Sequence, residues 1–371
     1  MAWLGTWAKR IKLDIDYTNK IGASVTQFPV TIHLKAANGD TENIFSEVGA
    51  NSQKIAITQS DGTTQLYAEV ELWDNTNSVA IIHTSLSTWT ISADTSIYLY
   101  YDNTQADNTT YIGDTPGSSP ASNVWDSNFV MVQHMNDATT SSVLDSTGNN
   151  NDGTKGSANN PLQADGKIGK GQNFSADYIT LPNNASLLDN DYITIEQWVY
   201  YVPVSANPRF VAFDHDPNSG YGYVQTMCLD NGYANVAYSE MKISGTGRGC
   251  LSANNTIAEN AWTNFVMTYD GSYIRHYING ALVTTSSLYS GTLDPLQPRY
   301  ELVLGRSNGM DYMSGTMDEI RISNIARSAA WSKASYNSGN DSLLTYGEEE
   351  GGTTTVVKDI ICSNGLIVFP R

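Results

Sequence analysis

Four short stretches of this sequence hold residue types that could do chemistry, and each has a suggestive spacing. They are Gly305-Arg-Ser-Asn-Gly309, Glu69-Val-Glu71, Asp318-Glu319 and Asp214-His-Asp216. The first has the spacing of a serine nucleophile, which must stand at a turn from a strand into a helix. The acidic pairs suggest glycoside hydrolysis, which needs two carboxyl groups roughly 5–9.5 Å apart across the bond. The last sets an imidazole between two acids, which could tune its pKa.

The surrounding sequence argues against each kind of chemistry. A Gly/Tyr-rich stretch and a predicted strand from Met317 to Ser323 follow Ser307, so we expect a hairpin loop there and no helix. On a regular strand Asp318 and Glu319 point to opposite faces, whereas the pair at 69 and 71 shares one face. We interpret that shared face as the wet side of an amphipathic strand. Asp214–Asp216 precedes a Pro-Asn-Ser-Gly run that is typical of a solvated turn.

The composition narrows the function further. Charged residues make up 16% of the 371 residues and hydrophobic residues 40%, and the net charge is −18. Because nucleic-acid binding needs a concentrated basic surface, a chain with this net negative charge is expected to have no nucleic-acid partner. No stretch approaches the ~20 apolar residues of a membrane span, so we expect no membrane insertion. The five histidines are otherwise scattered along the sequence, so we expect them to form no metal-ligand cluster. We therefore predict that the protein is not an enzyme.

The hydrophobic pattern has period two almost throughout, which indicates β-strands. Ile11, Leu13 and Ile15 alternate with polar residues, and Asn-Gly and Asp-Gly pairs recur at the tight turns that hairpins need. The one convincing helical segment runs from Ala326 to Tyr336. The predicted fold is all-β, with two antiparallel β-sandwich (jelly-roll) domains in tandem and a short C-terminal tail.

Two breaks in the pattern divide the chain. A stretch rich in proline and glycine covers 113–122, and Gly347-Glu-Glu-Glu-Gly-Gly352 precedes an apolar end. We predict a first sandwich over 1–112, a linker over 113–122, a second sandwich over 123–346 and a linker with an anchoring tail over 347–371. Cys228 and Cys250 could form a bridge, but free, partly buried thiols are the expected state for assembly in a reducing cytoplasm.

The second sandwich carries motifs that resemble the LamG-like jelly-roll family of the concanavalin A-like lectin/glucanase superfamily. They include Gly166-Lys-Ile-Gly-Lys-Gly-Gln-Asn-Phe174, Ile193-Thr-Ile-Glu-Gln-Trp198, Trp262-Thr-Asn-Phe-Val-Met-Thr-Tyr-Asp-Gly271 and Gly315-Thr-Met-Asp-Glu-Ile-Arg-Ile-Ser323. The first part, with Tyr67-Ala-Glu-Val-Glu-Leu-Trp73 and Ile97-Tyr-Leu-Tyr-Tyr101, resembles a family of uncharacterised function (the DUF2341 type) that often precedes LamG-like domains. That second resemblance implies a sandwich and no chemistry.

The LamG resemblance implies a structural ion. One structural calcium ion is common in such jelly rolls, and Asp145 and Asp318 lie in family motifs with the oxygen ligands that calcium prefers. An alternative account has Asp145 bonding the backbone of its own turn. No other cofactor is expected. Sugar recognition uses aromatic faces beside polar rim groups. The candidates in the Gly/Asn-rich segment are Tyr221, Tyr223, Tyr233 and Tyr238.

The first ten residues lack the apolar run of a secretion signal, although the domains are of extracellular type. This mismatch predicts a non-enzymatic bacteriophage virion surface protein, as a head decoration or a tail or fibre component. Its expected partners are other virion proteins, further copies of itself as a homo-oligomer, and host-surface glycans. The alternative is a bacterial cell-surface adhesin or glycan-binding accessory module with an extracellular location.

Overall fold

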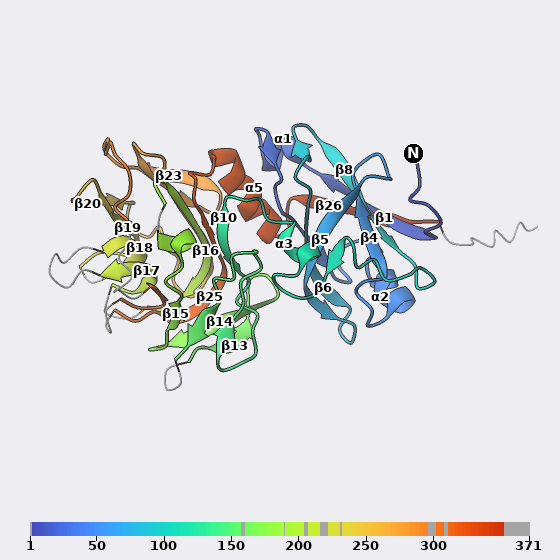
Figure 1. Cartoon of the computed structure of the whole chain (residues 1–371), viewed down its shortest axis with the longest axis horizontal. Helices are drawn as coiled ribbons and strands as arrows, with labels where there is room; N and C mark the ends of the chain where they lie inside the picture. Colours follow the sequence, from blue (N-terminus) through green and yellow to red (C-terminus); the bar gives the residue numbers. More distant parts are fainter. Residues whose placement is uncertain are drawn as a thin grey trace, which may run out of the picture.

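The computed structural model describes residues 2–156, 160–188, 190–203, 207–215, 222–230, 232–295, 302–307 and 311–351. The described chain is mostly β-structure in sandwich-like sheets, as the alternating pattern predicts (Figure 1). The predicted strand at Ile11–Ile15 is confirmed, because the side chains of Ile11, Leu13 and Ile15 are buried on one face. None of the described helices is long and apolar enough to cross a membrane.

The first sandwich is built on one strongly bent sheet. Its strand order is β26-β1-β8-β4-β5-β6-β3, with β9 added beside β5. The long strand β5 pairs with β4 at its start and with β6 along the rest of its length. The elements are β1 (Lys9–Ile15), α1 (Tyr17–Lys20), β2 (Val25–Thr26), β3 (Val30–Leu34), α2 (Glu42–Val48), β4 (Ile55–Thr58), β5 (Gln65–Asp74), β6 (Val79–Ser85), β7 (Thr90–Ile91), β8 (Thr95–Tyr101), β9 (Ile112–Gly113) and α3 (Ser119–Ser122).

The second sandwich has two sheets that enclose its core. One sheet has the order β13-β14-β25-β16-β21-β22-β23 with β10 beside β25, and the other has the order β11-β12-β15-β24-β17-β18-β19-β20. Phe265, Met267, Ile320 and Ile322 face this core, as their alternation predicts.

The second sandwich is formed by β10 (Phe129–Gln133), β11 (Ser142–Val143), β12 (Gly153–Lys155), β13 (Leu162–Asp165), β14 (Lys170–Ser175), β15 (Ile179–Leu181), α4 (Ala185–Leu188), β16 (Ile193–Tyr201), β17 (Arg209–His215), β18 (Gly222–Leu229), β19 (Val236–Ile243), β20 (Thr246–Leu251), β21 (Trp262–Tyr269), β22 (Ile274–Ile278), β23 (Ala281–Thr285), β24 (Leu302–Leu304) and β25 (Ser314–Ser323). The chain then continues into α5 (Ala329–Gly339) and β26 (Leu344–Gly351).

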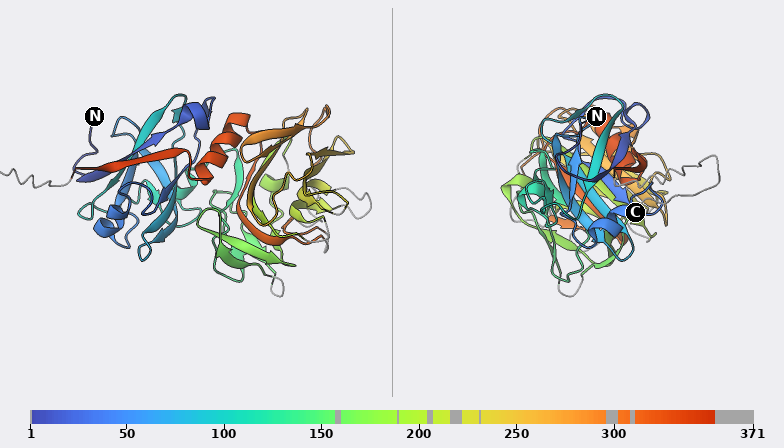
Figure 2. Two further views of the ribbon diagram at one scale, coloured as in Figure 1. Left: turned by 180° about the vertical axis from the view of Figure 1, so that it is seen from behind. Right: turned by 90° about the vertical axis from the view of Figure 1, so that its right-hand side faces the viewer.

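The last described strand returns to the first sandwich. Strand β26 pairs antiparallel with β1, with Lys9 opposite Gly351 and Ile15 opposite Leu344. Figure 2 shows β26 running onto the sheet of the first sandwich after α5, which lies between the two sandwiches. The prediction that a linker begins at 347 is therefore wrong, because residues 347–351 complete the first sheet. Residues 352–371, which include the predicted anchoring tail, lie outside the described part.

The predicted linker at 113–122 is also packed and not free. Gly113 lies in β9, and a Cβ at this position would come within 2.7 Å of the backbone nitrogen of Ala121. Val124 and Trp125 after it, and Trp331 of α5, join the hydrophobic core of the first sandwich. The two sandwiches therefore share packing across the boundary that the composition suggested. The predicted helix exists but runs over 329–339, because Ser328 caps it by accepting a hydrogen bond from the backbone N–H of Trp331.

Candidate functional site

A row of polar side chains crosses the outer face of strands β17 to β20. Val224, Thr226 and Cys228 of β18 face inward: Val224 and Cys228 join the core, and Thr226 hydrogen bonds to Gln197 of the facing sheet. The alternating position Gln225 therefore faces outward. Arg209 Nε donates a hydrogen bond to Gln225 Oε1 at 3.0 Å. The far end of the guanidinium is 2.9 Å from a carboxylate oxygen of Asp311.

The row continues through Glu240, which lies directly opposite Gln225 in the pairing of β18 with β19. Its carboxyl group is buried, and among the described residues Glu240 Oε1 has no hydrogen-bond partner. Burial raises the pKa of Glu240 to about 7, although Arg209 and a hydrogen bond with Tyr238 act in the opposite direction. This carboxyl group therefore holds its proton more tightly than an exposed glutamate does, and its Oε1 is both buried and unpaired.

Tyr238 ends the row and is partly exposed. Its phenol end lies against Gly249 of β20, where a Cβ would come within 2.4 Å of the tyrosine oxygen. Glycine is therefore needed at 249 for the ring to lie across the strand. Leu251, which pairs opposite Tyr238, is 44% exposed. The two side chains place an apolar surface beside the Glu240 carboxyl group, the combination that sugar-binding sites use.

The predicted tyrosine site is only partly assembled by the described residues. Tyr233 precedes β19 and is 51% exposed, but no described contact joins it to the row. Tyr221 and the side chain of Tyr223 lie outside the described residues. The sequence missed Arg209, Gln225 and Glu240, because only the register of three strands brings them together. For Gln225 and Glu240, the alternation with inward-facing residues on β18 and β19 was the available signal.

The two predicted calcium ligands lie in different elements. Asp145 accepts hydrogen bonds from the backbone N–H groups of Val132, Thr147 and Asn151 at 2.8–2.9 Å. These are the turn contacts of the alternative account. Asp318 of β25 is fully buried and accepts a 2.8 Å hydrogen bond from the backbone N–H of Ile168. Burial and the neighbouring Glu319 raise the pKa of Asp318 well above its usual value. No described contact joins the two carboxylates, so calcium at either stays a prediction.

The stretches around Ser307 and His215 lie in other settings than expected. Ser307 follows β24, and the chain then passes to β25 in the opposite sheet, so the expected hairpin loop is instead a connection between sheets. No helix follows Ser307 in the described residues 311–313. Asp214 and His215 end strand β17 and do not form the expected turn, while Asp216 lies outside the described part. Cys228 and Cys250 are free, buried thiols.

The acidic pair at 69 and 71 is buried and not on a wet face. Glu69 is 1% exposed, and the Glu71 side chain is fully buried. Both lie on β5 where the second sandwich packs against it. The sequence pattern does not predict this packing. His83, His134 and Glu319 complete a group whose ligand atoms, with that of Glu71, all lie within 4.8 Å of one another.

Burial and the charges of neighbouring side chains shift the pKa values of the titratable residues in this buried group. Burial lowers the pKa of His134, but Glu319 and Glu69 outweigh that effect and raise the pKa well above its usual value. Burial and the positive His134 hold the pKa of His83 well below its usual value. Burial raises the pKa of Glu71 well above its usual value. Burial acts the same way on Glu319, yet Arg321 and His134 outweigh it and lower the pKa.

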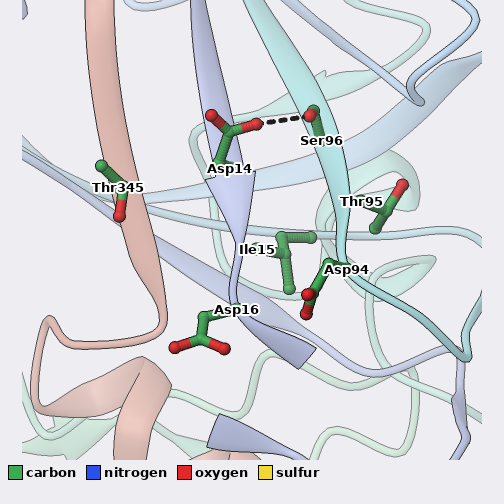
Figure 3. A pocket seen from close by; sticks show the side chains of 7 residues that line it. All are labelled: Asp14, Ile15, Asp16, Asp94, Thr95, Ser96 and Thr345. Atoms are coloured by element: carbon green, nitrogen blue, oxygen red, sulfur yellow. Dashed lines mark hydrogen bonds between the residues drawn. The ribbon is translucent and has the colours of Figure 1, made fainter. Parts of the chain in front are cut away.

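A surface hollow in the first sandwich gathers three aspartates, Asp14, Asp16 and Asp94 (Figure 3). Each already accepts a hydrogen bond within the protein. The donors are the Ser96 hydroxyl at 2.5 Å, the backbone N–H of Asn19 at 2.9 Å and the backbone N–H of Thr18 at 2.8 Å, respectively. The hollow is therefore an acidic surface whose carboxylates already have partners.

The two packed antiparallel sheets define a β-sandwich. Residues 172–331 match the family model described as the concanavalin A-like lectin/glucanases superfamily. The match lies within the second sandwich, so the relation of the first to the DUF2341 type stays a prediction. No curated protein matches the chain in sequence.

Several solved structures are similar to this chain. Domain 4 of AbnA, a GH43 extracellular arabinanase from Geobacillus stearothermophilus solved with arabinotriose, is 19% identical with a TM-score of 0.45. The similarity covers 56% of this chain and 98% of that domain. The binding domain of Paraclostridial Mosquitocidal Protein 1 is 16% identical, with a TM-score of 0.45 and coverage of 57% of this chain and 52% of that one. The receptor binding domain of botulinum neurotoxin D is 14% identical, with a TM-score of 0.43. That similarity covers 57% of this chain and 52% of the neurotoxin chain. The similarity thus spans about half of each toxin domain.

Proposed function

We propose that the second sandwich is a glycan-binding module and that its ligand binds on the outer face of β17–β20. The observation that carries this proposal is the position of Tyr238, whose ring lies across Gly249 beside the buried Glu240 carboxyl group. The ring and Leu251 offer an apolar surface to a sugar face, and the Glu240 carboxyl group lies beside it, buried and with Oε1 unpaired.

The rest of the row prepares this surface for binding. Arg209 and Gln225 are held by Asp311 and by each other, so little side-chain freedom is lost when a ligand binds. All the residues of the row lie within the range that matches the lectin superfamily model. A binding module needs no carboxylate pair flanking a bond, and the closely spaced buried acids 69 and 71 are covered by packing. These observations support the proposal that the protein acts by adhesion and not by hydrolysis.

The test is a glycan microarray of the full chain, followed by calorimetry on the best oligosaccharide. Tyr238→Ala is expected to weaken binding at least tenfold, and Tyr238→Phe less, since it keeps the ring and loses only the hydroxyl. Tyr192→Ala is the matched control, because Tyr192 is a 40% exposed tyrosine of the same sandwich outside the row. Unchanged binding by Tyr238→Ala, or equal loss in the control, would reject this site.

The finer prediction of a bacteriophage virion protein concerns where the module is displayed. The glycan-binding face serves either a particle or a cell surface, since both need adhesion to glycans. Immunogold microscopy with antibody against the second sandwich separates them. Gold on capsids or tails supports the virion, and gold on cell envelopes supports the adhesin.

A further inference from the structure

The strongest unassigned feature is the buried group of Glu71, His83, His134 and Glu319 between the two sandwiches. Glu71 comes from β5 and His83 from β6 of the first sandwich, while His134 follows β10 and Glu319 lies on β25 of the second. The rings of His83 and His134 are stacked, with centroids 4.6 Å apart and planes 10° from parallel. Each sandwich thus contributes one histidine and one carboxylate to the same point.

The spacing of the four facing atoms fits a small coordination sphere. Glu71 Oε2 lies 2.9 Å from His83 Nε2 and 3.7 Å from His134 Nδ1. Glu319 Oε1 lies 2.6 Å from His134 Nδ1 and 3.9 Å from His83 Nε2. Ligands bound tetrahedrally at about 2.0–2.1 Å are roughly 3.3 Å from one another. The four separations fall on both sides of that value, so small side-chain shifts would close the sphere.

The outer contacts orient each ligand as a metal site requires. His83 Nδ1 hydrogen bonds to the Thr31 hydroxyl at 3.1 Å, which leaves Nε2 facing the group. His134 Nε2 points toward Glu69 Oε2 at 3.4 Å, which leaves Nδ1 facing inward. Arg321 donates two hydrogen bonds to Glu319 Oε2, at 2.8 and 2.6 Å, and leaves Oε1 free. Histidine and carboxylate ligands of metals are commonly held by such second contacts.

Two buried atoms of the group are left without partners. Within the described part of the chain, neither Glu71 Oε1 nor His134 Nε2 has a hydrogen-bond partner. An unsatisfied buried polar atom costs about 1–3 kcal/mol, so a fold keeps it where something else is gained. These two are not the proposed ligand atoms, which hydrogen bond to one another: His83 Nε2 with Glu71 Oε2 at 2.9 Å, and His134 Nδ1 with Glu319 Oε1 at 2.6 Å.

The backbone is distorted where both carboxylates enter the group. Glu71 is the extra residue of a β-bulge in β5, between Val70 and Leu72 in the pairing with β6. Glu319 lies in a bulge of β25 and has a φ of 52°, a left-handed conformation that a glutamate rarely adopts. Bulges redirect side chains, and backbone strain of this kind concentrates at functional sites. Both distortions converge on one point from opposite sandwiches.

The ligand types of the group point to one class of metal. Two imidazoles and two carboxylates suit zinc and related transition metals, because calcium prefers six to eight oxygen ligands.

We propose that Glu71, His83, His134 and Glu319 bind one divalent transition-metal ion, of which zinc fits best, and that this ion joins the two sandwiches. Because all four ligands are buried, the site has no open position for a substrate and is structural. Its free energy of binding then adds to the stability of the contact between the sandwiches. This proposal is independent of the glycan site on the far sheet.

The test measures metal in the full chain, produced without a histidine tag in zinc-supplemented medium and also refolded with zinc. Elemental mass spectrometry should find about one zinc ion per chain after gel filtration. Cobalt(II) refolded into the chain should give the visible absorption of a four-coordinate N/O site. His83→Gln and His134→Gln should each lose the bound metal, and zinc should raise the melting temperature of the wild type only.

Controls separate loss of a ligand from loss of folding. His33→Gln changes another buried interface histidine, which contacts Ser338 O and not the group, and should keep its metal. Glu71→Gln keeps nearly the same volume, and circular dichroism reports whether it folds. The proposal is overturned if the folded wild type holds no stoichiometric transition metal by either route. It is equally overturned if folded Glu71→Gln and both histidine variants retain the ion, which would then bind elsewhere.

Discussion

The two sheets of the second sandwich have similar inner faces but differ in what covers their outer faces. The outer face of β16 and β25 is covered by α5 and by the first sandwich, where Glu196 accepts hydrogen bonds from Trp331 Nε1 and Ser335 Oγ at 3.0 and 2.6 Å. The outer face of β17–β20 carries Arg209, Tyr238 and Glu240, with its aromatic end partly exposed. Acidic residues on the covered face therefore hold the molecule together, whereas Glu240 on the other face belongs to the proposed glycan site.

The largest expected effect comes from breaking the covered face at Arg321. Arg321→Met removes the one guanidinium that neutralises buried Glu319, and should cost about 3–5 kcal/mol of unfolding free energy in urea. The surface pair is the control: Arg275→Met loses a salt bridge to Asp270 that is partly exposed and should cost about 0–1 kcal/mol. Equal effects of the two substitutions would contradict the distinction between the faces.

A smaller effect is expected where α5 covers the sheet. Trp331→Phe keeps most of the buried ring but leaves Glu196 with one fewer donor, so it should cost about 1.5–3 kcal/mol. Trp73→Phe removes a comparable bond from indole to the uncharged carbonyl of Gly49 and should cost about 0.5–1.5 kcal/mol. Urea unfolding of the two variants measures the difference, and a larger loss for Trp73→Phe would speak against a charged anchor at Glu196.

Sequence reasoning predicted well wherever one residue pattern sets the structure by itself. The alternation at Ile11–Ile15 gave β1, and the apolar alternation around Ile320 gave the inward face of β25. It failed where distant segments meet. Strand β26 was expected to be a linker because its glutamates and glycines have no strand pattern, yet its pairing with β1 supplies the backbone partners.

The candidate sites show the same limit. Glu69 and Glu71 have the alternation of a solvated strand, and only the packing of a second sandwich on β5 buries them. The bulge at Glu319 breaks the regular alternation that was assumed for Asp318 and Glu319. Tyr238 was predicted from the Gly/Asn-rich composition of its segment. The position of the Glu240 carboxyl group beside it depends on strand register, which the composition does not give.

The outer face of β17–β20 also predicts a pH dependence of stability, through the buried carboxyl group of Glu240. The pKa of Glu240 is raised to about 7 in the folded chain, so the folded state holds this proton more tightly than the unfolded state. The contribution of Glu240 to stability is therefore greatest below the ordinary glutamate pKa and falls as pH rises toward about 7, by at most about 1.4 kcal/mol per pH unit. Glu240→Gln should lack this contribution. Urea unfolding between about pH 5 and pH 8 checks it, and parallel curves for the two proteins would exclude the raised pKa.

The smallest expected effect is on the reactivity of the two described cysteines, Cys228 and Cys250. They lie in β18 and β20, two of the strands that form the proposed binding face. Burial raises the pKa of Cys228 to about 12 and that of Cys250 to about 11, so both thiols should stay protonated and react slowly with alkylating agents at pH 8. Peptide mapping after timed alkylation should show both modified mainly after unfolding. Fast modification of Cys228 in the folded chain would mean that β18 opens readily and is not the rigid base of a binding face.

The central claim is that the outer face of β17–β20, and not that of β16 and β25, binds the ligand. Hydrogen–deuterium exchange of the full chain, with and without the oligosaccharide selected on the array, tests it most directly. The account predicts slower exchange on binding in 222–230 and 236–251, with no change in 193–201, 314–323 or 65–74. Protection confined to β16, β25 or the contact between the sandwiches would contradict it.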